Sequence, residues 1–361
     1  MKLVEVQVLR ALAALAVVVL HAQHEAVLLA AATGRNFMMS QLLPWQAGVD
    51  VFFVISGFIM VYASERLFGR PGGQAVFLAH RIARIVPLYW AVTSVYLALA
   101  LVAPGLLNAE AHSPGLVAAS YLFWPYARPD GLPLPVYSLG WTLNYEMFFY
   151  ALFALALGLS RTRAVVSVIA GLAALVLVGR LLAPLPQPAA FWTHPIILEF
   201  AFGAALGLAR ANGVRLGGVL RAGLAVLGLL LLAADFDRPD APFHVTRAFA
   251  YGLPASLLVA AAALGRPVER VGWPTRLGIL VGDASYALYL VHPFAVRGLR
   301  ELVQRLGLAA LPAPVFVVAA LVAATLVAVL VHRLVEAPAV RAAKRLLEPD
   351  AKPLPGASPS P

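Results

Sequence analysis

Long apolar runs, separated by short polar or proline- and glycine-containing segments, extend along almost the whole chain. The hydrocarbon core of a bilayer is about 30 Å thick, so a spanning helix needs about 20 mostly apolar residues. Runs of this size recur until about residue 335, and the pattern predicts an all-α, polytopic membrane protein of about ten transmembrane helices. The expected helices cover residues 4–31, 48–64, 82–104, 137–159, 164–183, 194–210, 218–235, 247–265, 277–296 and 313–335.

The breaks between these runs define the expected domain organisation. Residues 1–340 are predicted to form one membrane domain without an internal repeat. The longest gap, Pro104–Val136, is expected to lie at the membrane interface or to re-enter the membrane in part. Residues 341–361 are first basic and then rich in Pro and Ser, which predicts a short disordered tail.

Composition supports the membrane assignment. The 361 residues are 61% hydrophobic and only 12% charged, which is too little charge to cover a soluble domain of this length. A net charge of +10 could indicate a nucleic-acid partner, but in a membrane protein Lys and Arg gather in cytoplasmic loops. We therefore expect the lipid bilayer as a partner and no nucleic acid. The chain has no cysteine, which excludes disulfides and thiol catalysis, and no metal cofactor is expected.

The distribution of basic residues predicts the orientation. With the N-terminus in the cytoplasm, 19 of the 27 basic residues fall on the cytoplasmic side. The eight on the outer side are Arg35, Arg128, Arg180, Arg238, Arg247, Arg297, Arg300 and Arg305. This asymmetry places both termini in the cytoplasm.

The first predicted helix carries ionisable residues at depth. Arg10 and His21 are eleven residues apart, close to three turns, so they share a helix face about 16 Å apart. His24 follows one turn later. Arg10 alone could snorkel to the cytoplasmic boundary as a topology signal. Two histidines within the membrane cost more to bury and indicate a functional site.

Two carboxylates are expected near the histidines. Asp50, in the segment GVDVFFVISGF, lies at the outer end of the second predicted helix, although an interfacial Asp would look the same. In that segment Gly57 and Ser56 would allow another helix to approach closely. Glu146, in SLGWTLNYEMFFY, falls in the outer half of the bilayer and needs Arg10 or a histidine as a partner, unless it is neutral.

Two further motifs add candidate binding residues. Arg81 and Arg84, in RIARIVP, are one turn apart, and paired guanidinium groups suit phosphate oxygens; positive-inside flanking is the alternative. Tyr286, Tyr289 and His292, in SYALYLVHP, form a polar stripe, which could also be a packing stripe. We expect the histidines and arginines to face each other through a single cavity.

These motifs, with the R-x10-H of the first helix, occur in the order seen in the membrane-bound acyltransferase-3 family. The chain most resembles the exopolysaccharide O-acetyltransferase branch of that family, from Val4 to about Glu336. The resemblance implies ten helices in the bacterial inner (cytoplasmic) membrane. It also implies transfer of an acyl group, usually acetyl from cytoplasmic acetyl-CoA, to a sugar on the far side. The implied partners are acyl-CoA, a saccharide acceptor and polysaccharide assembly proteins.

The resulting mechanistic hypothesis gives His21 the role of general base or transient acyl carrier, oriented by Glu146 or Asp50. Arg81 and Arg84 would bind the phosphates of the cofactor, with Arg10 closer to the thioester. The expected substrate-binding residues are His24, Trp141, Tyr286, Tyr289 and His292. A transporter or flippase of a lipid-linked saccharide is the main rival, and a structural scaffold is the other. No inverted repeat or broken helix pair is visible in the sequence to favour a transporter. The acceptor and the choice between acetyl and other acyl groups stay open.

Overall fold

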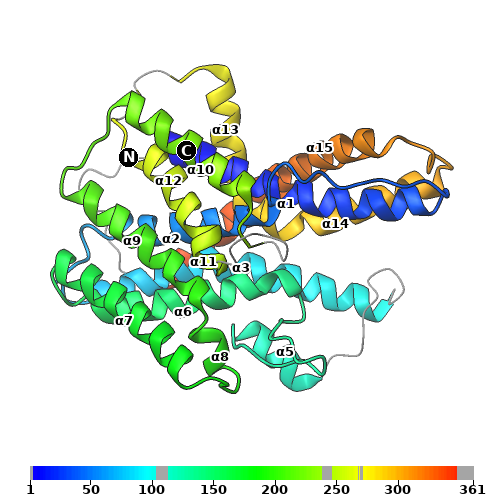
Figure 1. Cartoon of the computed structure of the whole chain (residues 1–361). Coiled ribbons are helices and arrows are strands. Elements are labelled where there is room, and N and C mark those ends of the chain that lie inside the picture. Colours follow the sequence, from blue (N-terminus) through cyan, green and yellow to red (C-terminus); the bar gives the residue numbers. More distant parts are fainter. Residues whose placement is uncertain (1–2, 103–112, 238–245, 267, 269–270, 348–361) are drawn as a thin grey trace.

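The computed structural model describes residues 3–102, 113–237, 246–266, 268 and 271–347, and these residues form helices and no strands. Three long helices pack together as an arm that projects from the rest of the molecule (Figure 1). They are α1 (Val4–Ala31), α14 (Ser285–Arg305) and α15 (Ala313–Val331). Because α1 is unbroken over 28 residues, it links the arm to the helices of the main body.

In the body, α2 (Gly48–Ala63) and α9 (Leu198–Ala211) pack closely against each other. Glycines make this contact possible. A Cβ at Gly57 would collide with the carbonyl of Phe200, and a Cβ at Gly203 would collide with the carbonyl of Val54. Small residues let helix backbones approach in this way inside membranes. The close approach expected at Gly57 is therefore present, with α9 as the partner.

The other helices surround this pair. The longer ones are α3 (Gly73–Val102), α6 (Trp141–Ala156), α7 (Arg161–Leu181), α10 (Gly218–Ala234), α12 (Gly252–Ala263), α13 (Trp273–Asp283) and α16 (Ala337–Leu347). The short ones are α5 (Pro114–Tyr121), α8 (Ala189–Trp192) and α11 (Arg247–Ala250), with 3₁₀ turns at Trp45–Ala47, Ser138–Gly140 and Pro195–Ile197. In the described part of the 104–136 gap, the structure thus contains α5.

The helix expected over residues 277–296 is in fact two helices. α13 and α14 meet at Ala284 with a bend of 75°. α13 packs on α1, where a Cβ at Gly282 would collide with the carbonyl of Gln7. The expectation that the chain has no broken helix pair is therefore wrong. The bend has a consequence for the site, because it turns Ser285 toward α1.

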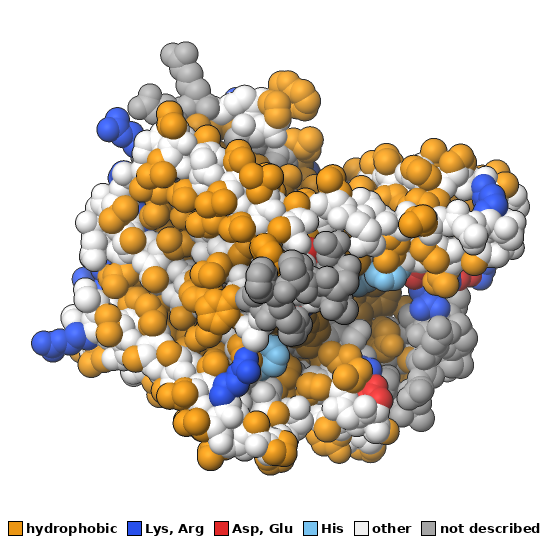
Figure 2. Space-filling view, in the orientation of Figure 1, with side chains coloured by type: hydrophobic (Ala, Val, Ile, Leu, Met, Phe, Trp, Pro, Cys, Tyr) orange, Lys and Arg blue, Asp and Glu red, His pale blue; other side chains and the backbone are white. Residues whose placement is uncertain are grey.

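Within the described ranges, five helices are long and apolar enough to cross a membrane, and the α13–α14 pair would be a sixth. The five are α1, Trp45–Ala63, α3, α7 and the continuous Ala313–Leu347. α10 and Arg247–Ala263 are apolar but shorter. Figure 2 shows apolar side chains over most of the visible face of the body, as expected of a surface that contacts lipid. The chain is a helical membrane protein, while these spans do not by themselves establish ten crossings.

The C-terminal helix of the described chain extends past residue 340. α15 continues through a π-helical turn, His332–Glu336, into α16. Residues 341–347 are thus helical and form the end of α16, which packs against α3. The remainder of the tail that was expected to be disordered, 348–361, lies outside the described residues. Such π-helical turns often occur at functional sites.

Candidate active site

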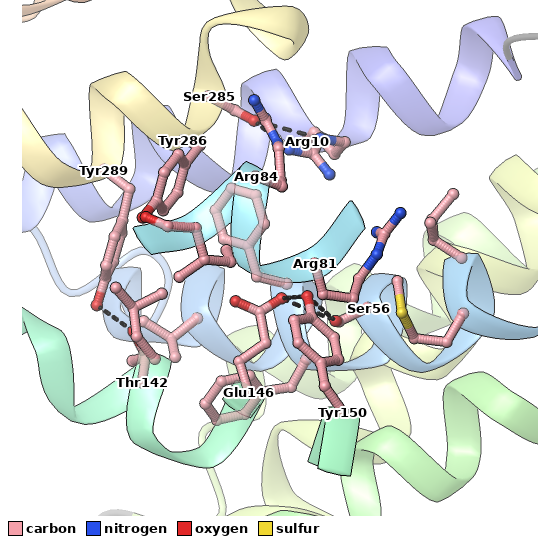
Figure 3. Close-up of a pocket in the computed structure, with 17 residues that line it drawn as sticks. Arg10, Ser56, Arg81, Arg84, Thr142, Glu146, Tyr150, Ser285, Tyr286 and Tyr289 are labelled. Atoms are coloured by element: carbon pink, nitrogen blue, oxygen red, sulfur yellow. Dashed lines mark hydrogen bonds between the residues drawn. The ribbon is translucent and has the colours of Figure 1, made fainter. Parts of the chain in front are cut away.

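A cavity of about 110 Å³ lies where α1, α2, α3, α6 and α14 meet (Figure 3). Its polar lining residues are Arg10, Ser56, Arg81, Arg84, Thr142, Glu146, Tyr150, Ser285, Tyr286 and Tyr289. Three guanidinium groups and one carboxylate thus share a space whose other lining side chains are hydroxyl-bearing or apolar. We call it the arginine cavity.

Arg10 is held at this cavity by the helix break. Its Nη2 and Nε donate to the Ser285 hydroxyl at 2.9 and 3.2 Å, and Figure 3 shows the two side chains directed at each other. Ser285 is the first residue of α14, and the bend before it brings its side chain to α1. Arg10 therefore lines an internal cavity instead of only marking the cytoplasmic boundary.

Glu146 faces the same cavity with partners that the sequence did not indicate. Its Oε1 accepts hydrogen bonds from the Ser56 hydroxyl at 2.8 Å and from the Tyr150 hydroxyl at 2.5 Å. The expected direct pairing with Arg10 or a histidine is absent from the hydrogen bonds of the described residues. The two hydroxyl donors hold the carboxylate of Glu146 in place at the wall of the cavity.

The two arginines of RIARIVP have different surroundings. Arg84 forms an ion pair with Glu336 of the π-turn, and its guanidinium lies 5.3 Å from the ring centre of Tyr286. Glu336 also contacts Nδ1 of His332 at 2.8 Å. Arg81 lies over the ring of Phe77, and its Nε has no hydrogen-bond partner among the described residues. Arg81 is therefore the more available of the two for an anion.

A second cavity, of about 640 Å³, lies between α1, α3 and α14. Its polar lining residues are His21, His24, Glu25, Tyr96, Tyr137, Ser138, Arg297, Glu301 and Arg305. We call it the histidine cavity. Figure 2 shows histidine, acidic and basic side chains together at the hollow beneath the arm.

The backbone sets the tautomer of His21. Its Nδ1 lies 2.9 Å from the carbonyl oxygen of Val17. A carbonyl can only accept a hydrogen bond, so Nδ1 carries the hydrogen and Nε2 keeps its lone pair. The same contact holds His24, whose Nδ1 is 2.9 Å from the carbonyl of Leu20. Neither Glu146 nor Asp50 orients His21, which differs from the hypothesis drawn from the sequence.

The arginine and histidine cavities share no lining residue. The expectation of a single cavity that holds both groups is therefore wrong. His292 is fully buried between them, with its ring 4.8 Å from that of His21 and 6.3 Å from that of Tyr289. Its Nδ1 contacts the carbonyl of Leu288 at 3.0 Å, and its Nε2 has no partner among the described residues. Tyr289 lines the arginine cavity and hydrogen-bonds Thr142 at 3.0 Å. His292 lines neither cavity, and Tyr286 and Tyr289 line only the arginine cavity.

Asp50 and Trp141 lie in a third place. The carboxylate of Asp50 accepts two hydrogen bonds from Arg247, at 3.0 and 2.8 Å. The Arg247 guanidinium stacks 6.0 Å from Trp141, and the buried Glu199 lies beside Asp50. The geometry is that of a buried ion pair that holds α2 to α11. Asp50 therefore contacts Arg247 and not His21 among the described residues, and Trp141 lines neither the arginine nor the histidine cavity.

Several residues of these sites were missed by the sequence analysis. Glu199 is a carboxyl in an apolar run. An ionisable residue inside a membrane segment indicates a functional site, as it did for Glu146, so Glu199 could have been found in the same way. Arg247 was counted only as an outer loop charge, and Glu336 only as the end of the resemblance. Ser56 was noticed for packing alone. Among the described residues, no group of three or more His, Cys, Asp or Glu side chains could hold a metal ion.

A helical membrane protein with charged cavities between its helices has the features of an integral membrane enzyme. The family model described as an acyltransferase domain, acyltransferase-3, matches residues 3–333. The exopolysaccharide production protein ExoZ of Rhizobium meliloti (strain 1021) is 36% identical over 322 residues, which cover 86% of this chain and 92% of the relative. The acyltransferase MdmB of Streptomyces mycarofaciens is 30% identical over 329 residues, 81% and 80% of the two chains. No solved structure matches the chain. The chain belongs to the acyltransferase-3 family and is an acyl-transferring enzyme of membranes.

Proposed function

We propose that this enzyme is an O-acyltransferase that moves an acyl group, in the first instance acetyl, from cytoplasmic acyl-CoA to a hydroxyl of a cell-surface or exopolysaccharide sugar. One observation carries the proposal: a single helix, α1, places Arg10 in one cavity and His21 in another. The first cavity has the charge that an acyl-CoA requires, and the second has the base that an acceptor hydroxyl requires. The family membership and the relation to ExoZ support the same assignment.

The arginine cavity is assigned to the acyl donor. A volume of about 110 Å³ has room for several water molecules, and so for an acetyl thioester but not for a whole CoA. The thioester would lie near Arg10, with the phosphates toward the mouth. Arg81, whose Nε is unpartnered among the described residues, would bind a phosphate oxygen, and Arg84 would do so by leaving Glu336.

The histidine cavity is assigned to the acceptor. The Nε2 lone pair of His21 accepts the proton of the sugar hydroxyl, and the hydroxyl oxygen forms a bond to the acyl carbon as the carbon–sulfur bond breaks. The proton ends on the sulfur of CoA, so the products are the ester and free CoA. Because His292 and Tyr289 separate the cavities, these side chains must move during transfer, whether His21 acts as the base or carries the acyl group between two steps.

The proposed topology has ten crossings in the inner membrane, with both termini in the cytoplasm. It adds α6, α9, α10, α11–α12 and the bent α13–α14 pair to the five spans that are long enough by themselves. The chain has no cysteine, so single cysteines give a clean test with a membrane-impermeant maleimide. Arg70→Cys, between α2 and α3, should be labelled only from the cytoplasmic side, and Gly298→Cys, in the histidine cavity, only from outside. Labelling of both from one side contradicts this topology.

Broken helix pairs like α13–α14 also occur in transporters. The absence of such a pair can therefore no longer be used as an argument against a flippase. Membership in an acyltransferase family favours acyl transfer over transport as the primary activity. The direct test supplies purified protein in lipid nanodiscs with radiolabelled acetyl-CoA and deacylated surface polysaccharide. We expect ester-linked label on the saccharide, a loss of at least 100-fold in His21→Ala, and normal transfer in His194→Asn, which changes an exposed histidine outside both cavities. Full transfer by His21→Ala refutes the assignment of the base.

A further inference from the structure

Three arginines are concentrated on the last turns of α14. They are Arg297, Arg300 and Arg305, and they are three of the eight basic residues on the proposed outer side. Bacterial membrane proteins carry few basic residues in their outer segments, so a cluster there calls for a specific reason. Two of the three, Arg297 and Arg305, line the histidine cavity together with His21.

Within the part of the chain that the structure describes, the ion pairs of the cluster leave these two arginines without a directly paired carboxylate. Arg300 contacts Glu25 at 2.6 Å and Glu301 at 2.7 Å. Arg297 and Arg305 form no ion pair or hydrogen bond with a described residue, although their charges act on Glu301 from a distance. Three arginines thus face two glutamates, an excess of one positive charge when the histidines are neutral.

General explanations cover only part of this arrangement. Arg305 lies in the last turn of α14, where a cation is stabilised by the helix dipole. Arg297 lies two turns earlier, where that effect has faded. Its Nε is buried without an acceptor among the described residues, and a buried donor without a partner costs free energy. Arg297 is therefore poised for a partner that the described residues do not supply.

We propose that the histidine cavity binds an acceptor that carries an anionic group, a carboxylate or a phosphate, through Arg297, with Arg305 at the entrance. This inference rests on the proposed function, because it names the class of acceptor for that site. Arg297 is five residues after His292, about 7.5 Å along the helix, and His292 packs on His21. An oxyanion held by Arg297 would thus place a neighbouring hydroxyl of the same molecule near His21.

The walls of the cavity fit a saccharide beside the anion. Tyr96 and Tyr137 line it, with ring centres 5.5 Å apart, and aromatic faces next to polar groups are common in sites that fix the orientation of a ligand. The oxyanion has two possible sources, an acidic sugar within the acceptor or the phosphate of a lipid carrier. Both present oxygens that a guanidinium binds with two parallel hydrogen bonds.

Binding of defined probes to the purified protein in nanodiscs tests this inference. The probes are a glucuronate-containing tetrasaccharide, the same tetrasaccharide with its carboxylates reduced to alcohols, and inorganic pyrophosphate. We expect the acidic tetrasaccharide or pyrophosphate to bind at least tenfold more tightly than the neutral tetrasaccharide. Binding of the first alone identifies an acidic sugar, and binding of pyrophosphate identifies a phosphate group.

Variants assign the binding to Arg297. Because a hydrogen bond to a charged group contributes about 1.5–3 kcal/mol, Arg297→Gln should weaken binding of the anionic probe about 10- to 100-fold. Arg297→Lys should recover part of the loss. Arg163→Gln, an exposed arginine on α7, is the matched control. Equal binding of acidic and neutral probes, or unchanged binding by Arg297→Gln, overturns the inference.

Acetyl-CoA binding and acetyl transfer, measured on the same preparations, separate the two levels of the proposal. If wild-type protein transfers acetyl but Arg297→Gln does so equally well, the anionic subsite is wrong and the proposed function stands. If wild-type protein neither binds acetyl-CoA nor transfers acetyl to any saccharide, the proposed function itself fails. Retained acetyl-CoA binding by Arg297→Gln shows that this variant is folded.

Discussion

Asp50→Asn gives a sharp test of whether Asp50 is structural or catalytic. Asp50 is fully buried and neutralises Arg247 through two hydrogen bonds. The amide of Asn keeps the shape but removes the charge, so the guanidinium is left without its countercharge. Removing one partner of a buried ion pair costs about 3–5 kcal/mol. We expect the lower end, about 3 kcal/mol, because the Arg247 side chain is 26% exposed and Glu199 lies nearby.

The assay is the half-life of the purified protein at a fixed elevated temperature in detergent, because membrane proteins commonly unfold irreversibly. A loss of about 3 kcal/mol that appears wholly in the unfolding rate shortens the half-life roughly 100-fold. Glu199→Gln is the matched control. One guanidinium balances only one of the two buried carboxyls, so Glu199 is expected to be protonated, and Gln resembles that form. We expect its half-life to change by less than about fivefold.

The double variant Asp50→Asn/Arg247→Gln removes both charges of the pair and should recover most of the lost half-life, with acyl transfer restored to near the wild-type rate. Two results would refute the structural role of Asp50. One is a stable Asp50→Asn protein with no transfer activity. The other is a double variant that is stable but inactive, which would show that Asp50 acts in the reaction.

Two further predictions concern helix packing and the wall between the cavities. Gly203→Ala should strongly lower thermal stability, because its Cβ would collide with the Val54 carbonyl. The control Gly223→Ala, which has open space around it, should be neutral or stabilising by up to about 1 kcal/mol. Equal melting temperatures of the two variants would contradict the close α2–α9 contact. His292→Leu should lower turnover about 100-fold with unchanged acetyl-CoA affinity, because its ring packs 4.8 Å from that of His21, the proposed base, and a misplaced catalytic group can cost about 10²-fold. Wild-type turnover in steady-state kinetics would show that His292 only fills space.

Much of the helical pattern follows from the sequence because lipid exposure requires continuous apolar runs. α1, α7 and α15 have such runs, and their positions agree with the expected ranges. The break at Ala284 does not follow, since no proline marks it and the bend depends on how α13 packs against α1. α3 begins at Gly73, nine residues before the expected helix, because His80, Arg81 and Arg84 interrupt the apolar pattern between its first two turns and the long apolar run.

The candidate site could be predicted in part. The spacing of Arg10 and His21 on one helix is a local property, and both residues line internal cavities. Their partners depend on contacts between distant segments. Asp50 and Arg247 are 197 positions apart, and Arg84 and Glu336 are 252 apart. From a single sequence, a charged residue cannot be matched to a partner so far along the chain. Nor does the sequence distinguish one shared cavity from two separate cavities.

Acetyl-CoA binding by Arg81→Gln and His21→Ala tests most directly the division of labour between the arginine cavity and the histidine cavity. We predict that Arg81→Gln raises the dissociation constant at least tenfold, because it removes a charge-assisted contact to phosphate, while His21→Ala binds acetyl-CoA like the wild type and transfers none of it. Normal binding by Arg81→Gln together with weakened binding by His21→Ala would contradict this division, since the donor would then occupy the histidine cavity.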